Sequence, residues 1–203
     1  MAVPHGNIHP TADVADSAVV ATSSRVWHYA QLRENAVIGE NCIIGRGAYI
    51  GIGVELGDNC KVQNYALIYE PARLGAGVFV GPSVVFTNDQ FPRAITPNGD
   101  LKSGSDWESV GVTVLDGASL GAGSICIAPV TIGKWALVGA GSVVSKDVPN
   151  FALVVGNPAR RVGWVGKTGH PLTNNGDGTW ACPITSDKYT QVGTGELIEM
   201  PES

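Results

Sequence analysis

The chain has 203 residues and a formal net charge of −5, and charged residues make up only 15% of it. A chain of this length predicts one domain with at most a small appendage. The acidic balance, with no stripe of Lys and Arg, argues against nucleic acid as a partner, although a few local cations would suffice for a phosphorylated ligand.

The first ten residues have neither a basic start nor an apolar run, so no secretory signal is expected there. No apolar stretch approaches the length that spans a bilayer. The four cysteines form no C-x-x-C pair, and Cys42, Cys60 and Cys126 fall where buried side chains are expected. These features predict a cytoplasmic protein with no membrane partner and no metal.

An apolar side chain at every sixth position is the strongest pattern in the chain. An α-helix produces spacings of three and four and an ordinary strand produces two, so neither explains an unbroken period of six. A fixed period indicates a repeat architecture in which each unit buries its apolar face against the next. The first run of apolar positions is Ile8, Val14, Val20, Val26, Leu32, Ile38, Ile44, Ile50, Leu56, Val62, Ile68, Leu74, Val80 and Phe86.

Two further positions repeat with the same period. The residue two before each apolar position is small or compact, as in Ala30 and Ala48, and glycine recurs one residue after it, as in Gly39 and Gly45. We interpret each hexapeptide as a short face followed by a turn, where Gly and Asn fit because they tolerate a positive φ. Three faces would close one triangular coil of about eighteen residues, and stacked coils would share a narrow aliphatic core.

The period breaks once, after Phe86, and returns in a new frame at Val114. The intervening segment, 87–111, is polar and rich in Pro and Gly, so it is predicted to leave the column as a loop. Such an excursion from a regular scaffold often carries function. A surface decoration without function is the alternative interpretation.

The second run of repeats has its apolar positions at Val114, Leu120, Cys126, Ile132, Val138 and Val144. Pro149 is expected to end the repeat, because proline cannot supply a ladder hydrogen bond, and 151–155 is expected to form one more apolar strand. We predict that 7–163 forms one domain.

The remaining residues, 164–203, follow a different pattern. A strong turn signal at 174–178 accompanies short β-like pieces near 179–182, 189–192 and 196–198. We predict a small C-terminal β-rich extension, either capping the exposed end of the last coil or loosely attached to it.

Over about residues 7–163, these hexapeptides resemble those of the left-handed parallel β-helix acyltransferases. The resemblance implies an all-β, left-handed parallel β-helix that assembles as a homotrimer, with coenzyme A bound in clefts between neighbouring columns. Gln31 stands where the family often has a second histidine, and the tail lies outside the common acyltransferase core.

Three segments, at 26–30, 62–70 and 81–93, narrow the resemblance to enzymes that N-acetylate 3-amino sugars on nucleotide diphosphates. They are similar to UDP-2-acetamido-3-amino-2,3-dideoxy-glucuronate N-acetyltransferases, and relatives act on dTDP-linked 3-amino-3,6-dideoxyhexoses. The resemblance therefore implies an acetyl-CoA-dependent N-acetyltransferase acting on the 3-amino group of a UDP- or dTDP-linked sugar.

The resemblance assigns Asn88 the role of holding and orienting the reacting amine; an asparagine that caps a turn is the alternative. Substrate-binding roles are implied for Asn64, Tyr69, Glu70 and Arg93. Glu70 could bind a hydroxyl or act as an auxiliary base, or it could be a solvated turn carboxylate. Surface charge is the alternative for Arg93.

The family pattern places the donor along the second run of repeats. Backbone groups near Gly121, Ala122, Gly139 and Ala140 are implied to face the pantetheine arm of coenzyme A. Lys146, Arg160 and Arg161 are implied to meet its phosphates. A basic cluster that caps the end of the column is the alternative for these cations.

None of His5, His9, His28 and His170 lies in the 86–93 segment, so the departing coenzyme A thiolate, rather than a protein histidine, is expected to accept the proton. His5 and His9 are interpreted as terminal residues, and only His28 is expected within the repeats. A γ-type zinc carbonic anhydrase needs histidines from neighbouring coils and fits poorly. Acyl transfer to another amine or hydroxyl acceptor, such as an antibiotic-type sugar, and a non-catalytic trimeric scaffold stay open.

Overall fold

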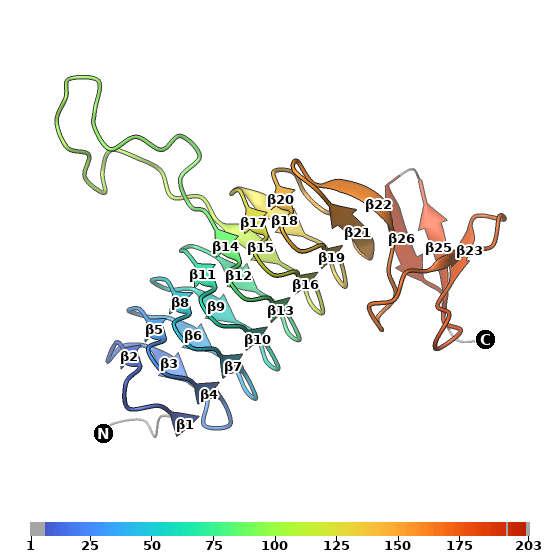
Figure 1. Ribbon diagram of the computed structural model, residues 1–203, viewed down its shortest axis with the longest axis horizontal. Helices are drawn as coiled ribbons and strands as arrows, with labels where there is room; N and C mark the ends of the chain where they lie inside the picture. The colour runs from blue at the N-terminus through green and yellow to red at the C-terminus, as the bar shows by residue number, and fades with distance from the viewer. Residues whose placement is uncertain (1–6, 194, 202–203) are drawn as a thin grey trace.

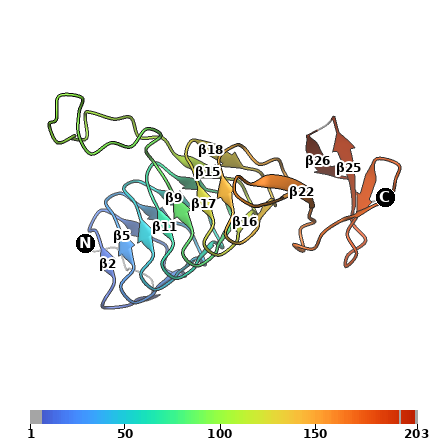
Figure 2. The ribbon, with the colours of Figure 1, turned by 45° about the horizontal axis from the view of Figure 1, so that its top comes forward.

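The computed structural model describes residues 7–193 and 195–201. Within these ranges the chain forms strands, turns and bends but no helix, and the strands build a long three-sided column with a small sheet at one end (Figure 1). The N-terminal coils and the C-terminal sheet lie at opposite ends of the long axis in both views (Figures 1 and 2). The predicted all-β parallel β-helix is confirmed, and its left-handed sense stays a prediction.

Three parallel sheets form the sides of the column. Sheet A contains β1 (Asn7–Ile8), β4 (Arg25–Val26), β7 (Ile43–Ile44), β10 (Lys61–Val62), β13 (Phe79–Val80), β16 (Ser119–Leu120), β19 (Leu137–Val138), β21 (Ala152–Val155) and the antiparallel β22 (Arg160–Trp164). Sheet B contains β2 (Asp13–Val14), β5 (Gln31–Leu32), β8 (Tyr49–Ile50), β11 (Leu67–Ile68), β14 (Val85–Phe86), β17 (Ile125–Cys126) and β20 (Val143–Val144). Sheet C contains β3 (Val19–Val20), β6 (Val37–Ile38), β9 (Glu55–Leu56), β12 (Arg73–Leu74), β15 (Val112–Val114) and β18 (Val130–Ile132).

The turns between strands form three edges that run along the column. The A–B edge consists of the corners at 9–12, 27–30, 45–48, 63–66, 81–84, 121–124 and 139–142. The B–C edge consists of 15–18, 33–36, 51–54, 69–72, 87–111, 127–129 and 145–147. The C–A edge consists of 21–24, 39–42, 57–60, 75–78, 115–118, 133–136 and 149–151.

The apolar positions of the repeat fill the interior of the column. From Val20 to Val144 every one of them is buried, with Ile50 and Phe86 fully excluded from solvent, while Ile8 and Val14 in the first coil are partly buried. Burial of each such side chain stabilises the folded chain by roughly 1.5–3 kcal/mol. The core is therefore a single line of stacked aliphatic side chains.

The recurrent glycine one residue after each apolar position has a different physical reason from the one predicted. A positive φ occurs two residues further on, at Gly47 (62°) and Asn59 (61°). At Gly45 the constraint is space, because a Cβ atom there would lie 2.6 Å from the backbone nitrogen of Asn64 in the next coil. Glycine at this position therefore permits close stacking of coils, and the turn conformation is adopted elsewhere in the corner.

Pro149 does not end the column, and the further apolar strand expected at 151–155 is confirmed as β21. Pro149 lies in a corner of the C–A edge, where its missing N–H breaks no ladder, and β21 follows it in parallel register with β19. The column then ends where β22 turns back antiparallel on β21.

The extension forms a four-stranded antiparallel sheet from β23 (Thr173–Asn174), β24 (Thr179–Ala181), β25 (Lys188–Val192) and β26 (Glu196–Glu199). Tyr189 is fully buried, and its ring centroid lies 5.1 Å from that of Phe151 in the last corner of the column. Trp164 and Leu172 belong to the same buried cluster. The extension therefore packs against the end of the column and covers its last coil.

The predicted loop, 87–111, leaves the column between β14 and β15 and projects well clear of it (Figure 2). We call it the arm. Inside it, Ile95 and Leu101 form an antiparallel bridge, and Thr96 N donates to Asp100 O at 2.8 Å. The strands on either side keep their ladders, since β14 pairs with β17 and β15 pairs with β12.

Candidate functional site

The base of the arm positions Asn88 at the surface of the B–C edge. The fully buried Phe86 anchors the end of β14, and Thr87 Oγ1 accepts a 3.0 Å hydrogen bond from Ala128 N in the next coil. Asn88 itself is half-buried, and its carbonyl accepts a 3.0 Å hydrogen bond from Val110 N. This bond closes the base of the arm, so the backbone of Asn88 is held between the core and the returning chain.

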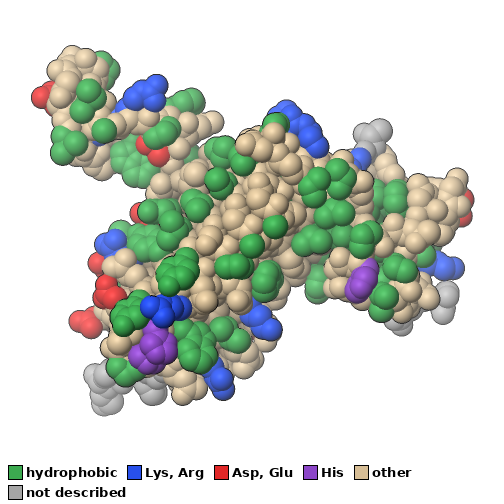
Figure 3. Space-filling view, viewed as in Figure 1, with side chains coloured by type: hydrophobic (Ala, Val, Ile, Leu, Met, Phe, Trp, Pro, Cys, Tyr) green, Lys and Arg blue, Asp and Glu red, His purple; other side chains and the backbone are tan. Residues whose placement is uncertain are grey.

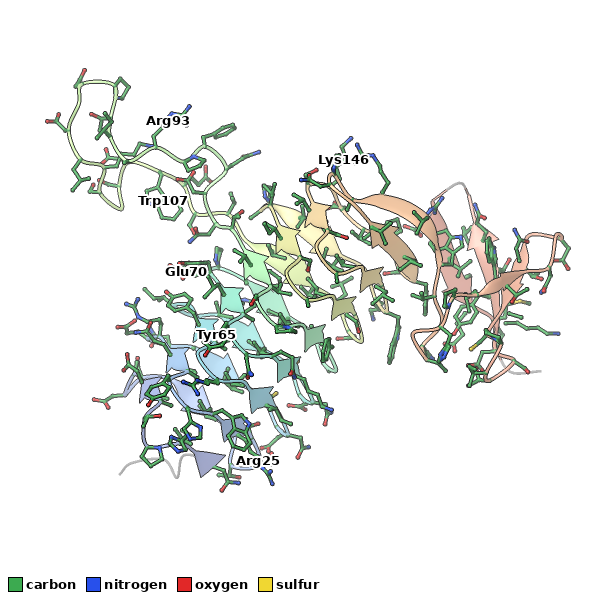
Figure 4. All side chains as sticks on the ribbon, viewed as in Figure 1. Arg25, Tyr65, Glu70, Arg93, Trp107 and Lys146 are labelled. Atoms are coloured by element: carbon green, nitrogen blue, oxygen red, sulfur yellow. The ribbon has the colours of Figure 1, made fainter. Side chains whose placement is uncertain are left out.

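Glu70 lies on the same edge, one coil nearer the N-terminus (Figure 4). Its Oε2 atom is buried and has no hydrogen-bond partner within the described part of the chain. Ser109 Oγ, at the end of the arm, donates to the Glu70 carbonyl at 3.3 Å. A buried carboxylate oxygen without a hydrogen-bond donor is energetically costly.

Two tyrosines stand beside Glu70. The Tyr49 and Tyr69 rings lie with their centroids 4.9 Å apart, and Tyr69 is 36% exposed. Burial, and next the negative charge of Glu70, raise the pKa of the Tyr49 hydroxyl. Tyr69, Glu70 and Asn88 therefore form one polar and aromatic group where the arm leaves the column.

Arg93 and Asn64 do not belong to this group. Arg93 lies out on the arm, away from Glu70, and its Nη1 donates to the carbonyl of Pro92 at 2.7 Å (Figure 4). Asn64 lies on the A–B edge, where its Oδ1 accepts a 2.9 Å hydrogen bond from Arg46 N in the preceding coil. Within one copy of the chain, Asn64 and Glu70 therefore lie on opposite edges of sheet B.

The residues expected to bind the donor occupy three places. Gly121, Ala122, Gly139 and Ala140 form successive corners of the A–B edge, where Gly141 N donates to Ala122 O at 2.9 Å. Lys146 is exposed on the B–C edge, on the same side of the column as the arm (Figure 4). The glycine corners and Lys146 therefore flank sheet B.

The two arginines lie at the end of the column. Arg160 is exposed, and its Nη1 donates to the carbonyl of Ala159 at 2.9 Å. The Arg161 guanidinium stacks over the Trp164 ring at 4.1 Å, and its Nη1 donates to Gly195 O at 3.4 Å. Arg161 thus takes part in the packing of the C-terminal extension, which the sequence pattern did not indicate.

The interpretation of His9 as a terminal residue is wrong. His9 occupies the first corner of the A–B edge and stacks on His28, with ring centroids 3.4 Å apart. Burial, followed by the charges of His9 and Arg46, lowers the pKa of His28. His170 lies in the segment before the C-terminal sheet, and His5 lies outside the described residues.

The sequence pattern gave no role to three exposed aromatic side chains on the A–B edge. Trp27, Tyr29 and Tyr65 are 45%, 59% and 54% exposed. Tyr29 and Tyr65 stand at a corner position that Gly and Asn hold in other coils, which is the signal that could have identified them.

Within residues 7–193 and 195–201, no group of three or more His, Cys, Asp or Glu side chains is arranged to hold a metal ion.

The described residues contain no helix that is long and apolar enough to cross a membrane. The model of the family described as "Hexapeptide repeat of succinyl-transferase" matches residues 35–65 and 109–146, on both sides of the arm.

Among curated proteins, the dTDP-3-amino-3,6-dideoxy-alpha-D-galactopyranose 3-N-acetyltransferase of Aneurinibacillus thermoaerophilus is 54% identical over 59 residues, which cover 29% of this chain and 31% of that protein. The bifunctional protein GlmU of Fervidobacterium nodosum is 36% identical over 123 residues, which cover 59% of this chain and 23% of that protein. The chain matches less than a third of the length of each of these relatives.

Among solved structures, PerB from Caulobacter crescentus, in complex with CoA and GDP-perosamine, is 28% identical. It superimposes with a TM-score of 0.54 over 78% of this chain and 58% of that one. The repeat match, the three-sided parallel column and these likenesses show that the chain has a hexapeptide-repeat fold similar to that of these acetyltransferases.

Proposed function

We propose that the protein transfers the acetyl group of acetyl-CoA to the 3-amino group of a nucleotide-linked amino sugar. The observation that carries this proposal is the 54% identity to a relative whose name specifies a dTDP-linked 3-amino sugar as substrate. The structure of PerB with CoA and GDP-perosamine adds support, because it pairs this fold with the same two classes of ligand.

The base of the arm supplies groups that suit the acceptor. The side chain of Asn88 can hydrogen-bond a neutral amine and orient its lone pair, but it cannot take a proton. The carboxylate of Glu70, a partly exposed residue on the same edge, can accept a hydrogen bond from a sugar hydroxyl or from the amine. Positioning of this kind is a large part of catalysis when two bound reactants combine.

In the reaction we propose, the amine nitrogen attacks the thioester carbonyl carbon, so that a C–N bond forms and the C–S bond breaks. Among the described histidines, His9 and His28 lie on the A–B edge in the first two coils and His170 lies near the C-terminal sheet, so none stands at Asn88 of the same copy. The departing thiolate of coenzyme A therefore takes the proton that the nitrogen loses.

A trimer of identical chains would complete the site. The donor glycines lie on the A–B edge and Asn88 lies on the B–C edge, so in one copy the two halves face away from each other across sheet B. From β8 to β20, the outward side chains of sheet B form an apolar stripe of Tyr49, Leu67, Val85, Ile125 and Val143. A neighbouring copy that covers this stripe would bring its own A–B edge, with the donor glycines, to Asn88.

The arm also fits a neighbouring copy. Its side chains Phe91, Ile95 and Leu101 are 76%, 53% and 82% exposed. Large apolar side chains that project this far from a domain are best explained by a partner surface.

A cytoplasmic location forms part of the same proposal. Cys42, Cys60, Cys126 and Cys182 are all buried and unpaired. Disulfides form and persist in oxidising compartments, so unpaired thiols support a reducing one.

The test is an assay of free thiol release with acetyl-CoA and a panel of UDP-, dTDP- and GDP-linked 3-amino sugars. We expect release with at least one of these sugars, and we expect Asn88→Ala to lower kcat by roughly 100-fold because the amine loses its orientation. Coenzyme A binding should be unchanged in this variant, and Gln90→Ala, an exposed neighbour, should behave as the parent protein. Undiminished turnover by Asn88→Ala would refute the role of Asn88, and no thiol release with any sugar would refute the function.

A further inference from the structure

The N-terminal part of the A–B edge carries three exposed aromatic side chains that the acetyl-transfer chemistry above does not use. We call Trp27, Tyr29 and Tyr65 the aromatic shelf. All three expose close to half of their surface or more. Figure 3 shows histidine side chains beside hydrophobic and cationic ones on the surface of these N-terminal coils.

The backbone of the shelf indicates that its tyrosines are there for their side chains. Tyr29 and Tyr65 have φ values of 58° and 60°, in the left-handed region, where a bulky residue is strained and glycine is not. Gly47 holds the same corner position in the coil between them, with a φ of 62°. Strain that glycine would relieve, at two corners of one edge, points to a function of the aromatic rings.

Trp135 is another aromatic residue with a positive φ, and its ring does have a partner within the chain. Trp135, on the C–A edge, has a φ of 57°, and its ring lies over Gly117. The chain's own Lys167 places its Nζ 6.0 Å from the Trp135 ring centroid, and Trp135 is only half-exposed. Here the C-terminal extension is the partner of the ring.

In the shelf, too, a ring packs against a glycine of the preceding coil, but no described segment of the chain covers its outer side as Lys167 covers Trp135. The Tyr65 ring lies against Gly47, and the Arg46 guanidinium lies 5.2 Å from the Tyr29 ring centroid. The outward surface of both tyrosines stays exposed. A planar ring from a ligand could therefore stack where the protein leaves these surfaces open.

The charge of this edge selects the kind of ligand. The corners at 9–12, 27–30, 45–48, 63–66 and 81–84 contain Arg46 and two histidines but no Asp or Glu, although the chain as a whole has a net charge of −5. An acid-free edge with a guanidinium beside exposed rings favours a ligand that combines a planar base with an anion.

We propose that the aromatic shelf and Arg46 bind the nucleoside diphosphate part of the substrate, with the base stacked on the shelf and the diphosphate facing Arg46. This inference rests on the proposed function, which requires a nucleotide-linked sugar. The shelf lies across sheet B from Asn88 of the same copy, so the sugar reaches the Asn88 of a neighbouring copy in the trimer.

Calorimetric titration with UDP, dTDP and GDP, without acetyl-CoA, tests the shelf. We expect Tyr29→Gly and Tyr65→Gly to weaken binding of the preferred nucleotide by about tenfold or more, because base stacking is lost. Both variants should fold, since glycine suits a positive φ, and thermal melts followed by circular dichroism check this. Asn59→Gly is the matched control: it has a φ of 61° on the C–A edge, so its nucleotide affinity should be unchanged.

Inorganic pyrophosphate separates the two parts of the site. Arg46→Gln should weaken pyrophosphate and nucleotide alike and reduce the salt dependence of binding, whereas Tyr65→Gly should leave pyrophosphate binding intact. Unchanged nucleotide affinity in both tyrosine variants would overturn the proposal. If their oligomeric mass also changed, the shelf would be a subunit interface instead of a nucleotide site. Nucleotide binding that depends on the shelf, in a protein that releases no thiol, supports the shelf and refutes only the proposed activity.

Discussion

At the scale of single residues, adjacent side chains on one strand have opposite roles. Ile38 on β6 is 1% exposed and belongs to the stacked core, while its neighbour Val37 is 39% exposed on the outer face of sheet C. The strand alternates its side chains between the two faces, so the position alone decides which side chain is buried.

Ile38→Ala should therefore lower the free energy of unfolding by roughly 2–5 kcal/mol, because the column cannot collapse around the cavity that the substitution leaves. Val37→Ala, on the same strand, should change it by no more than about 0.5 kcal/mol. Equilibrium denaturation in urea measures both. Similar losses in the two variants would contradict the assignment of Ile38 to the core.

Single residues also show where the sequence pattern was sufficient and where it was misread. The apolar positions were predicted correctly because burial at a fixed period leaves a direct record in the sequence. The glycine at 45 was assigned to turn conformation, but its reason is the approach of Asn64 from the next coil. Only the stacked coils reveal this contact, because the two residues are far apart in the chain.

At the scale of elements, the arm is an insertion that the column tolerates. The 3.0 Å bond from Val110 N to Asn88 O brings the two ends of the arm together, and β14 pairs with β17 as if the arm were absent. The residues of the arm between these ends are mostly exposed. The arm thus adds little to the burial that stabilises the column.

Replacement of 90–108 by a short glycine linker should leave the thermal midpoint of the column almost unchanged, because no core side chain is removed. Thiol release should fall by at least about tenfold, since the proposed trimer that completes the site loses the apolar contacts of Phe91, Ile95 and Leu101. Scanning calorimetry and the thiol assay make the comparison. A variant that melts many degrees lower would show that the arm supports the column, and full activity would exclude it from the site.

Edges, rather than neighbouring positions in the sequence, decide which side chains meet. Corners of one edge recur every 18 residues, as in the bond from Arg46 N to Asn64 Oδ1. Asn64 and Glu70 differ by six, which is one edge, so the sequence itself contained the information that separates them. Coils on either side of the arm are 40 residues apart instead of 18, as in the hydrogen bond from Ala76 N to Asp116 Oδ1. The edge of each later corner could therefore be assigned only once the bounds of the arm were known.

At the scale of the whole molecule, the apolar stripe on sheet B distinguishes one side of the column from the others. Ile125 on this stripe is 36% exposed, and sheet B lies between the two edges that carry the halves of the proposed site. The proposed trimer would cover this face.

Light scattering coupled to gel filtration should therefore give the mass of three chains. Ile125→Asp should dissociate the trimer, because a charge would be buried without a partner, and it should abolish thiol release. Val37→Asp, an equally exposed apolar position on sheet C, should leave both the mass and the activity unchanged. A parent protein that elutes as a monomer would contradict the trimer directly.

The sequence by itself determined the column, the place of the arm and the presence of a small β extension, because a core of one side chain per face forces a six-residue period on the chain. Only the tertiary structure decided what the side chains outside that core meet: the buried, unpartnered oxygen of Glu70, the stacked His9 and His28, and Arg161 over Trp164. These contacts join coils or elements that are separate in the chain, and exposed side chains follow no periodic constraint that a sequence could display.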